Sequence, residues 1–222
     1  MTLHIGLIGA TGKVGRQIII CSEKDQKLAI VWKLSSQSDR KNLPPVDVII
    51  DFSSPLALQE NLELAQKQKT PIVIGTTGLQ TDQLKSLEIA SSRIAIFWAP
   101  NFSIGIAALV HAIEILSPLL RENFTANITE THHIHKKDAP SGSALAFAKA
   151  TLTGYPNLPP IESIRLEEII GEHTISFLGQ DEKITLSHEA LSREVFAKGA
   201  LQAAQFVLHK PPKLYGMKDL LH

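Results

Sequence analysis

The sequence lacks several features on which whole classes of protein depend. It has one cysteine, Cys21, which excludes an internal disulfide and a metal site built from several cysteines. Its 22 lysines and arginines are balanced by 22 aspartates and glutamates. This balance argues against nucleic acid as a partner, because phosphate binding needs clustered positive charge. No apolar run reaches the ~18 residues that a membrane-spanning helix needs.

The N-terminus also lacks the pattern of a signal peptide. It enters a strand-like segment directly, without a basic region followed by a long apolar stretch. Hydrophobic residues make up 44% of the 222 residues, which is enough for a substantial core. At about 100–200 residues per domain, this length predicts one large domain or two small ones. We therefore expect a soluble, cytoplasmic protein with no membrane partner.

The first hundred residues alternate between strand-like and helix-like segments. Short loops in such an alternation are typical of a parallel α/β sheet with right-handed crossovers. The polar segment 35–45 is too short for a helix with two loops and is predicted to be a plain connection. The predicted strands cover residues 3–8, 28–34, 46–52, 71–74 and 94–98, and the predicted helices cover residues 13–22, 54–67 and 81–91.

The pattern changes after residue 101. Two strand-like runs follow each other across a four-residue turn, which indicates a hairpin. This half of the chain predicts a smaller α+β domain with a mixed or antiparallel sheet, and a boundary near residue 103 separates it from the first domain. Its predicted helices cover residues 104–116, 141–153 and 192–209, and its predicted strands cover residues 124–133, 173–178 and 183–188.

A glycine-rich turn links the first predicted strand to the first predicted helix. Gly9, Gly12 and Gly15 follow the spacing Gly-x-x-Gly-x-x-Gly. Glycines at this place let backbone N–H groups approach a pyrophosphate, and the helix N-terminus adds partial positive charge. The alternative is a turn that needs glycine only for close packing. The flanking strand and helix favour a Rossmann-like, dinucleotide-binding domain.

The end of the second predicted strand is where an acidic residue would hold a ribose 2′-hydroxyl. The chain has Ser35 and Ser36 there, followed by Arg40 and Lys41. Hydroxyls and bases favour a 2′-phosphate, and therefore NADPH, although a solvated polar loop is an equal alternative. The predicted cofactor is NADPH or NADH, with Ser35 among its contacts.

Three further strand ends carry polar or small residues, in segments 51–54, 75–78 and 99–102. Ligands in open α/β sheets bind beyond the carboxyl ends of the strands. All three ends should lie at the edge that carries the glycine turn. Turn residues are common at strand ends, but the three together predict a cofactor crevice.

The segment 130–143 is the most informative part of the chain. It places His132, His133, His135, Lys136 and Lys137 close together at a strand end, just before a predicted helix. Histidine exchanges protons near neutral pH, and lysine binds carboxylates or donates a proton. The residues that follow, 141–143, open a helix whose free N–H groups form an anion site. The segment therefore suits a small anionic substrate.

Three alternatives to this interpretation stay open. If His133 and His135 lay on a strand, both imidazoles would point to one face and could bind a metal, as in a metal-dependent hydrolase. The segment could instead be a polar loop in which Ser141 caps the helix. A catalytically silent nucleotide-sensing protein could share the first domain. Because no further ligand cluster is evident, no metal is predicted.

These residues resemble one known family. The chain resembles the dihydrodipicolinate reductases of bacterial diaminopimelate and lysine synthesis over nearly its whole length. The segment 132–142, HHIHKKDAPSG, is highly specific to that family. Other matching segments are residues 9–16, 50–53, 73–78, 99–103, 171–173, 187–188, 192–193, 196–200 and 214–219.

The resemblance implies a reductase that moves a hydride from NADH or NADPH to a cyclic dicarboxylate imine. It implies a nucleotide-binding domain of residues 1–103, to which residues 198–222 return, and a substrate-binding and oligomerising domain of residues 104–197, which builds a homotetramer. His132 would be the proton donor and acceptor and Lys136 a proton donor, while His133, Gly142 and Ser143 would hold substrate carboxylates. The implied cofactor contacts are Gly9, Ala10, Thr11, Gly12, Lys13, Val14, Gly75, Thr76, Thr77, Ala99, Pro100, Asn101 and Phe102.

The chain departs from the family pattern in three places. It is short, mainly in the connection 35–45. Ser35 and Ser36 stand where many members carry an acid followed by a base, which leaves the choice between NADH and NADPH open. Ser143 replaces a commoner threonine and keeps the hydroxyl.

Overall fold

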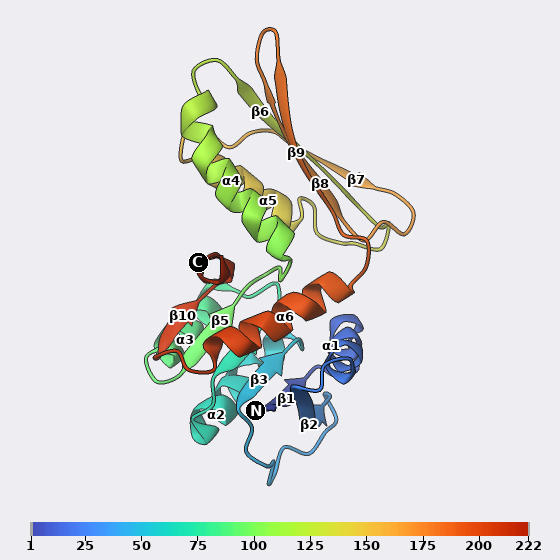
Figure 1. Cartoon of the computed structure of the whole chain (residues 1–222), viewed down its shortest axis with the longest axis vertical. Helices are drawn as coiled ribbons and strands as arrows, with labels where there is room; N and C mark the ends of the chain where they lie inside the picture. The colour runs from blue at the N-terminus through green and yellow to red at the C-terminus, as the bar shows by residue number, and fades with distance from the viewer. Residues whose placement is uncertain (1, 222) are drawn as a thin grey trace. The chain divides into compact units, whose positions relative to one another are not determined.

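Figure 1 shows the computed structural model of the chain, which describes residues 2–221. The chain folds into two compact units. Unit 1 contains the residues up to Phe102 together with those from Arg193 onward, and unit 2 contains Ser103–Ser192. The boundaries predicted from the sequence lay after residues 103 and 197.

Unit 1 is built on a six-stranded sheet whose strands all run parallel, in the order β10-β5-β4-β3-β1-β2. This confirms the predicted parallel, Rossmann-like sheet. From β1 the chain moves outward to β2 and then returns to β3 on the other side of β1, so the carboxyl ends of β1 and β3 form a topological switch point. The strands are β1 (Leu3–Ile8), β2 (Leu28–Leu34), β3 (Val48–Asp51), β4 (Ile72–Ile74), β5 (Ala95–Trp98) and β10 (Lys213–Tyr215).

Helices cover both faces of this sheet. Helices α1 (Lys13–Glu23) and α6 (Glu194–Val207) pack on one face, and α2 (Leu58–Gln68) and α3 (Thr81–Ser91) pack on the other. Strands covered on both faces need apolar residues throughout, which explains continuous runs such as that of β3. Each fully buried Val, Leu or Ile side chain contributes about 1.5–3 kcal/mol to folding.

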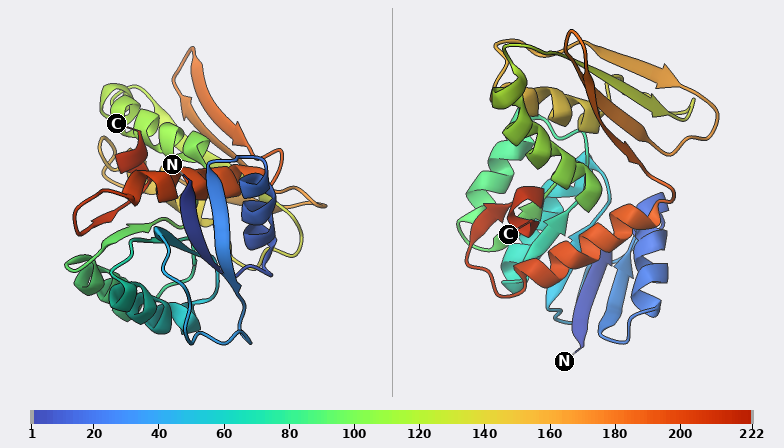
Figure 2. Two further views of the ribbon diagram at one scale, coloured as in Figure 1. Left: turned by 60° about the horizontal axis from the view of Figure 1, so that its bottom comes forward. Right: turned by 45° about the horizontal axis from the view of Figure 1, so that its top comes forward.

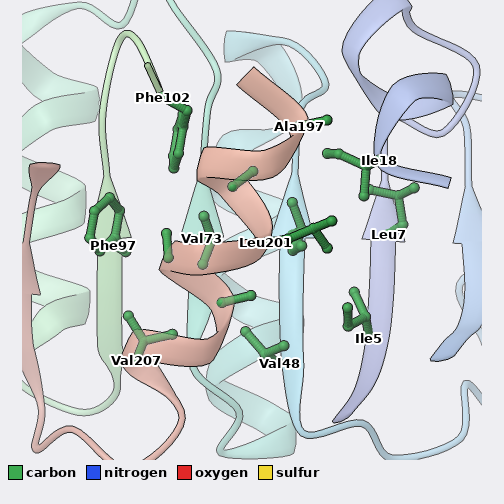
Figure 3. Close-up of a cluster of buried hydrophobic side chains, with 14 of the residues drawn as sticks. Ile5, Leu7, Ile18, Val48, Val73, Phe97, Phe102, Ala197, Leu201 and Val207 are labelled. Carbon is green, nitrogen blue, oxygen red and sulfur yellow. The ribbon is translucent and has the colours of Figure 1, made fainter. Parts of the chain in front are cut away.

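Helix α6 brings the end of the chain back to unit 1. Figure 3 shows Ala197, Leu201 and Val207 of this helix above the apolar side chains of the parallel strands. The buried face of α6 consists largely of alanine and also includes Gly199, where a Cβ would collide with the carbonyl oxygen of Phe102. Small residues therefore let α6 lie close to the sheet.

Unit 2 contains a mixed four-stranded sheet in the order β7-β6-β8-β9. The β6–β7 pair is parallel, and the β6–β8 and β8–β9 pairs are antiparallel. Figure 2 shows β8 and β9, in orange, as a long hairpin. The predicted α+β domain with a mixed sheet is thereby confirmed. The strands are β6 (Thr125–His132), β7 (Ile161–Arg165), β8 (Glu172–Leu178) and β9 (Lys183–Glu189).

Two helices of unit 2 complete its core. Helices α4 (Ile104–Leu120) and α5 (Gly142–Thr151) pack against the sheet through a cluster that includes Ile113, Phe147 and Phe177. Helix α4 is one turn longer than predicted and contains Pro118. Within residues 2–221, no helix is long and apolar enough to cross a membrane.

The sequence interpretation missed two strands and placed one helix start wrongly. Strands β7 and β10 were not predicted, because each is a short edge strand of five and three residues with little apolar signal. The helix predicted for residues 54–67 begins at Leu58, since Pro55–Ala57 form a 3-10 turn first. A further 3-10 turn, Met217–Leu220, follows β10.

Candidate active site

The glycine turn lies at the switch point of the parallel sheet. Gly9 has a φ of +83°, and a Cβ there would collide with the backbone of Phe52. A Cβ at Gly15 would collide with the carbonyl oxygen of Gly9. The turn therefore needs glycine for close packing of strand and helix, and this packing is what brings the backbone of the turn to the sheet edge.

The N-terminus of α1 is open to an anion. Its N-cap residue, Gly12, offers no side-chain acceptor, and its first turn carries no acidic residue. Uncapped N–H groups and the helix dipole attract negative charge at such a terminus. Gly9–Gly12 form the turn, and Lys13 and Val14 begin the helix. These residues fit a dinucleotide pyrophosphate.

The other predicted cofactor contacts lie at the same sheet edge. Ser35 follows β2, Gly75–Thr77 follow β4, and Ala99–Phe102 follow β5, and parallel strands bring all their carboxyl ends to one side. The hydroxyl of Thr76 is buried and has no hydrogen-bond partner within the described chain. A buried hydroxyl without a partner is costly, and a ligand at this edge would satisfy it.

The predicted contact Phe102 has a different position from the rest. Its ring is 1% exposed and packs against Phe52, with 5.2 Å between ring centroids, and against Phe97, at 5.7 Å. The side chain belongs to the core of unit 1. Only its backbone could reach a cofactor.

Arg40, the basic residue expected near the ribose, contacts other side chains of unit 1. Arg40 Nη1 donates to Asn61 Oδ1 at 2.6 Å, and Arg40 Nε lies 3.2 Å from Glu60 Oε1. Asn61 in turn donates to the buried carboxylate of Asp51 at 2.7 Å. Burial raises the pKa of Asp51, against the effect of its hydrogen bonds. Arg40 therefore anchors the connection 35–45 to the unit and is not free for a 2′-phosphate.

In unit 2, a polar row crosses the inner face of the sheet. The strand register aligns Ser163 of β7, Glu130 of β6, His173 of β8 and His188 of β9. Glu130 is 0% exposed and His173 is 4% exposed. Because side chains alternate along a strand, His132 lies on the same face as Glu130, two residues further on.

His132 is the centre of this cluster. Its Nδ1 lies within hydrogen-bond distance of Glu130 Oε2, and its ring stands edge-on to that of His173, with 4.9 Å between centroids. Burial lowers the pKa of His132, and the Glu130 carboxylate opposes this shift only in part. Burial also opposes ionisation of Glu130, but hydrogen bonds from Ser163 and Arg165 outweigh it and lower the Glu130 pKa.

The loop after β6 carries Lys136 and is held by Arg165. Lys136 Nζ lies 2.9 Å from Asp138 Oδ2, and this partner lowers the Asp138 pKa despite some burial. Arg165 donates to the backbone carbonyl of Asp138 at 2.5 Å and to Glu130 Oε1 at 3.0 Å. The ammonium of Lys136 is also close enough to depress the His132 pKa. An imidazole and an ammonium thus share one site.

The N-terminus of α5 lies at the end of this loop. Ser141 is the N-cap and accepts from the Ala144 N–H at 3.2 Å, as in the polar-loop alternative. Its hydroxyl also lies 3.0 Å from His173 Nε2, which ties the helix start to the polar row. A Cβ at Gly142 would meet no atom within 4 Å, and the first turn has no acidic residue. This terminus fits an anionic group.

The premise of the metal alternative is wrong. Strand β6 ends at His132, so His133 and His135 lie in the following loop rather than on one strand face. Among the described residues, the ligand-type atoms of Glu130, His132 and His173 do lie within 4.8 Å of one another. The nearby positive charges of Arg165 and Lys136 make that cluster unfavourable for a cation.

Sequence reasoning missed part of this site. It gave no role to Glu130, Asp138, Arg165 or His173, although all four contact or act on the predicted pair. One available signal was the spacing of Glu130 and His132, which a strand places on one face. Arg165 was missed together with the strand that carries it.

Comparisons with known proteins match nearly the whole chain. The family model "Dihydrodipicolinate reductase, N-terminus" matches residues 3–102, and "Dihydrodipicolinate reductase, C-terminus" matches residues 105–221. A 4-hydroxy-tetrahydrodipicolinate reductase of Xanthomonas euvesicatoria pv. vesicatoria is 37% identical, with 96% of this chain and 95% of that protein covered. The same enzyme of Bdellovibrio bacteriovorus is 36% identical, with 99% and 96% covered.

A solved structure shows the same fold. The dipicolinate-bound dihydrodipicolinate reductase from Paenisporosarcina sp. TG-14 matches with a TM-score of 0.81 at 24% identity, over 99% of each chain. Fold and site together define a nicotinamide-dependent oxidoreductase. The chain belongs to the dihydrodipicolinate reductase family, and the predicted resemblance is confirmed.

The buried His173 predicts a pH-dependent stability. Burial, followed by the charge of His132, lowers its pKa from 6.5 to about 3. Below pH 6.5 the unfolded chain therefore binds a proton that the folded chain refuses, and the folded state loses stability as the pH falls toward 3. This proton contributes a slope of up to about 1.4 kcal/mol per pH unit. Denaturant titrations at several pH values in this range give the free energy of unfolding as a function of pH. This free energy should change less steeply with pH for His173→Gln than for the wild type, and an equal dependence on pH would contradict the assignment.

Proposed function

We propose that this protein catalyses the NAD(P)H-dependent reduction of a cyclic dicarboxylate imine to tetrahydrodipicolinate, in diaminopimelate and lysine biosynthesis. The names of its relatives support this reaction. The observation that carries the proposal within the structure is the buried His132, which shares a site with Lys136 just before the N-terminus of α5. That site combines a proton donor with positions for negative charge.

Unit 1 would hold the cofactor. The backbone of the glycine turn and the uncapped first turn of α1 would bind the pyrophosphate, and the hydroxyl of Thr76 would find a partner there. Ser35, Gly75–Thr77 and the backbone of 99–102 would complete the contacts. A bound nicotinamide supplies the hydride.

Unit 2 would hold the substrate. The N–H groups at Gly142 and Ser143, with the dipole of α5, would receive one carboxylate. His133, which follows directly after β6, would contact a carboxylate as well. The ammonium of Lys136 would add charge-assisted binding. Two anionic groups in the substrate thus meet donors from a loop and a helix terminus of the same unit.

His132 and Lys136 would manage the proton. Hydride addition to a conjugated imine builds electron density that a neighbouring acid must neutralise. His132 would donate through Nε2, because its Nδ1 faces Glu130. Lys136, held by Asp138, would serve as a second proton donor.

Replacing His132 tests its role. His132→Gln should lower turnover by about 100- to 10,000-fold, the effect of losing a general acid, while affinity for the dinucleotide stays unchanged. Steady-state kinetics and dinucleotide titration measure the two quantities. Lys136→Ala should lower both turnover and substrate affinity, with the exposed neighbour Lys137→Ala as control. Full activity of His132→Gln would remove His132 from the mechanism.

The ribose end of the cofactor site predicts weak discrimination between NADH and NADPH. The two residues that directly follow β2, Ser35 and Ser36, carry no negative charge to repel a 2′-phosphate, and Arg40 Nη1 is hydrogen-bonded to Asn61. Both cofactors should therefore give kcat/KM values within about tenfold, or 1.4 kcal/mol. Ser35→Asp should lower kcat/KM for NADPH more than for NADH. A strong preference of the unaltered protein for one cofactor would contradict this expectation.

The family resemblance also supports a cytoplasmic homotetramer in which unit 2 joins the subunits. The sheet face opposite the polar row carries hydroxyl side chains, among them Thr174 and Thr185, and the partly exposed Ile164 and Leu178. Sedimentation equilibrium should give four times the chain mass of 24.3 kDa. A monomer at micromolar concentration would contradict the assembly.

A further inference from the structure

The cluster around His132 contains a buried carboxylate, Glu130, which neither contacts the substrate nor transfers a proton in the proposed reaction. Glu130 is 0% exposed, and an ionised carboxylate at such a place must be held by hydrogen bonds and charge. Its Oε1 accepts from Arg165 Nη1 at 3.0 Å, Ser163 of β7 provides a further hydrogen bond, and Oε2 faces His132 Nδ1. Every partner of Glu130 lies on the inner face of the same sheet.

This arrangement determines which nitrogen of His132 is available. With a carboxylate at Nδ1, the ring keeps a proton on Nδ1, and Nε2 becomes the nitrogen that gives and receives the transferred proton. The surroundings of Nε2 agree, since a Cβ at Gly171 would lie 2.9 Å from it. Glycine at this position therefore leaves room for the edge of the imidazole that carries Nε2.

We propose that Glu130, clamped by Arg165, is a positioning residue that orients His132 and keeps its Nδ1 protonated, so that Nε2 acts on the substrate. The proposal rests on the proposed function, because it assigns a partner to the same proton donor. Arg165 also holds the backbone near the site. Its other donated bonds reach the carbonyls of Ile164 and Asp138, so one guanidinium fixes both the carboxylate and the loop that bears Lys136.

A metal site is the competing explanation of the same residues. Glu130, His132 and His173 would supply three ligands. However, both oxygens of Glu130 already face donors, and His173 Nε2 lies 3.0 Å from the hydroxyl of Ser141. Arg165 and Lys136 add positive charge on two sides. The geometry favours a hydrogen-bonded positioning cluster.

The charge of Glu130 and its orientation of the His132 ring should affect the kinetics in different ways. The groups that face or act on His132 are Glu130, Lys136, Asp138, Arg165 and His173. Of these, the Glu130 carboxylate favours the imidazolium, while Lys136 and Arg165 oppose it. Removing the negative charge of Glu130 should lower the pKa of His132 further. If protonated His132 is the acid, kcat/KM should then fall at a lower pH.

The experiment compares Glu130→Gln, Glu130→Asp and the wild type in steady-state reduction of the cyclic substrate over a range of pH. Glu130→Gln should reduce kcat by about 10- to 100-fold, the size of effect found for carboxylates that orient metal-bound histidines. On the alkaline side of the pH profile, the pH at which kcat/KM falls should be lower by about one unit. The KM for the dinucleotide should not change, because unit 1 holds that ligand. Glu130→Asp keeps the negative charge. Its kcat/KM should therefore fall at nearly the same alkaline pH as that of the wild type, although its kcat is lower.

The matched control is Glu168→Gln. Glu168 also pairs with a histidine of unit 2, His135, at 3.8 Å, but both side chains are largely exposed. This variant should behave as the wild type. Circular dichroism and thermal unfolding of all variants separate loss of folding from loss of function.

The outcomes are distinct. A Glu130→Gln protein with wild-type pH limbs and kcat within twofold would overturn the positioning role. Stoichiometric zinc in the wild type, absent from Glu130→Gln, would overturn it in favour of the metal site. A wild type that does not reduce the cyclic substrate at all would instead overturn the proposed function. In that case, NMR of the imidazole nitrogens still tests the Glu130–His132 interaction. It shows whether His132 keeps its proton on Nδ1 when Glu130 is replaced by glutamine.

Discussion

A carboxylate without exposed surface, Glu130, is the constraint on which the polar site of unit 2 depends. Such a charge is stable only where several donors replace its water. Arg165, Ser163 and His132 do so from two neighbouring strands. Removing any one partner would leave the charge incompletely satisfied. The sheet register, the ring orientation of His132 and the ionisation of Glu130 therefore depend on one another.

The same cluster determines the position of the loop that follows. Arg165 binds the carbonyl of Asp138 near the middle of the loop, and Ser141 at its end contacts His173. These two contacts tie the loop that carries Lys136, and the start of α5, to the polar row. In unit 1, close packing fixes the position of the glycine turn, because its glycines let the turn lie against the backbone of Phe52. One unit thus builds its site from buried charge and the other from backbone proximity.

Local patterns made much of this predictable from the sequence. The alternation of strands and helices, the glycine turn and the specific segment 132–142 are all short-range signals, and the parallel sheet and the family are confirmed. What was missed is long-range. Glu130 and Arg165 are 35 positions apart, and β7, which carries Arg165, is a five-residue edge strand. Arg40 was expected near the ribose, but its partner Asn61 lies 21 positions away and lacks any local signal.

The most direct test of the central interaction is the protonation state of the His132 ring in the folded protein. Heteronuclear NMR of the imidazole nitrogens, assigned with His132→Gln, distinguishes a proton on Nδ1 from one on Nε2. The Glu130–His132 contact predicts that neutral His132 carries its proton on Nδ1 and leaves Nε2 bare. A proton on Nε2, or the mixture of tautomers found in free histidine, would contradict the account.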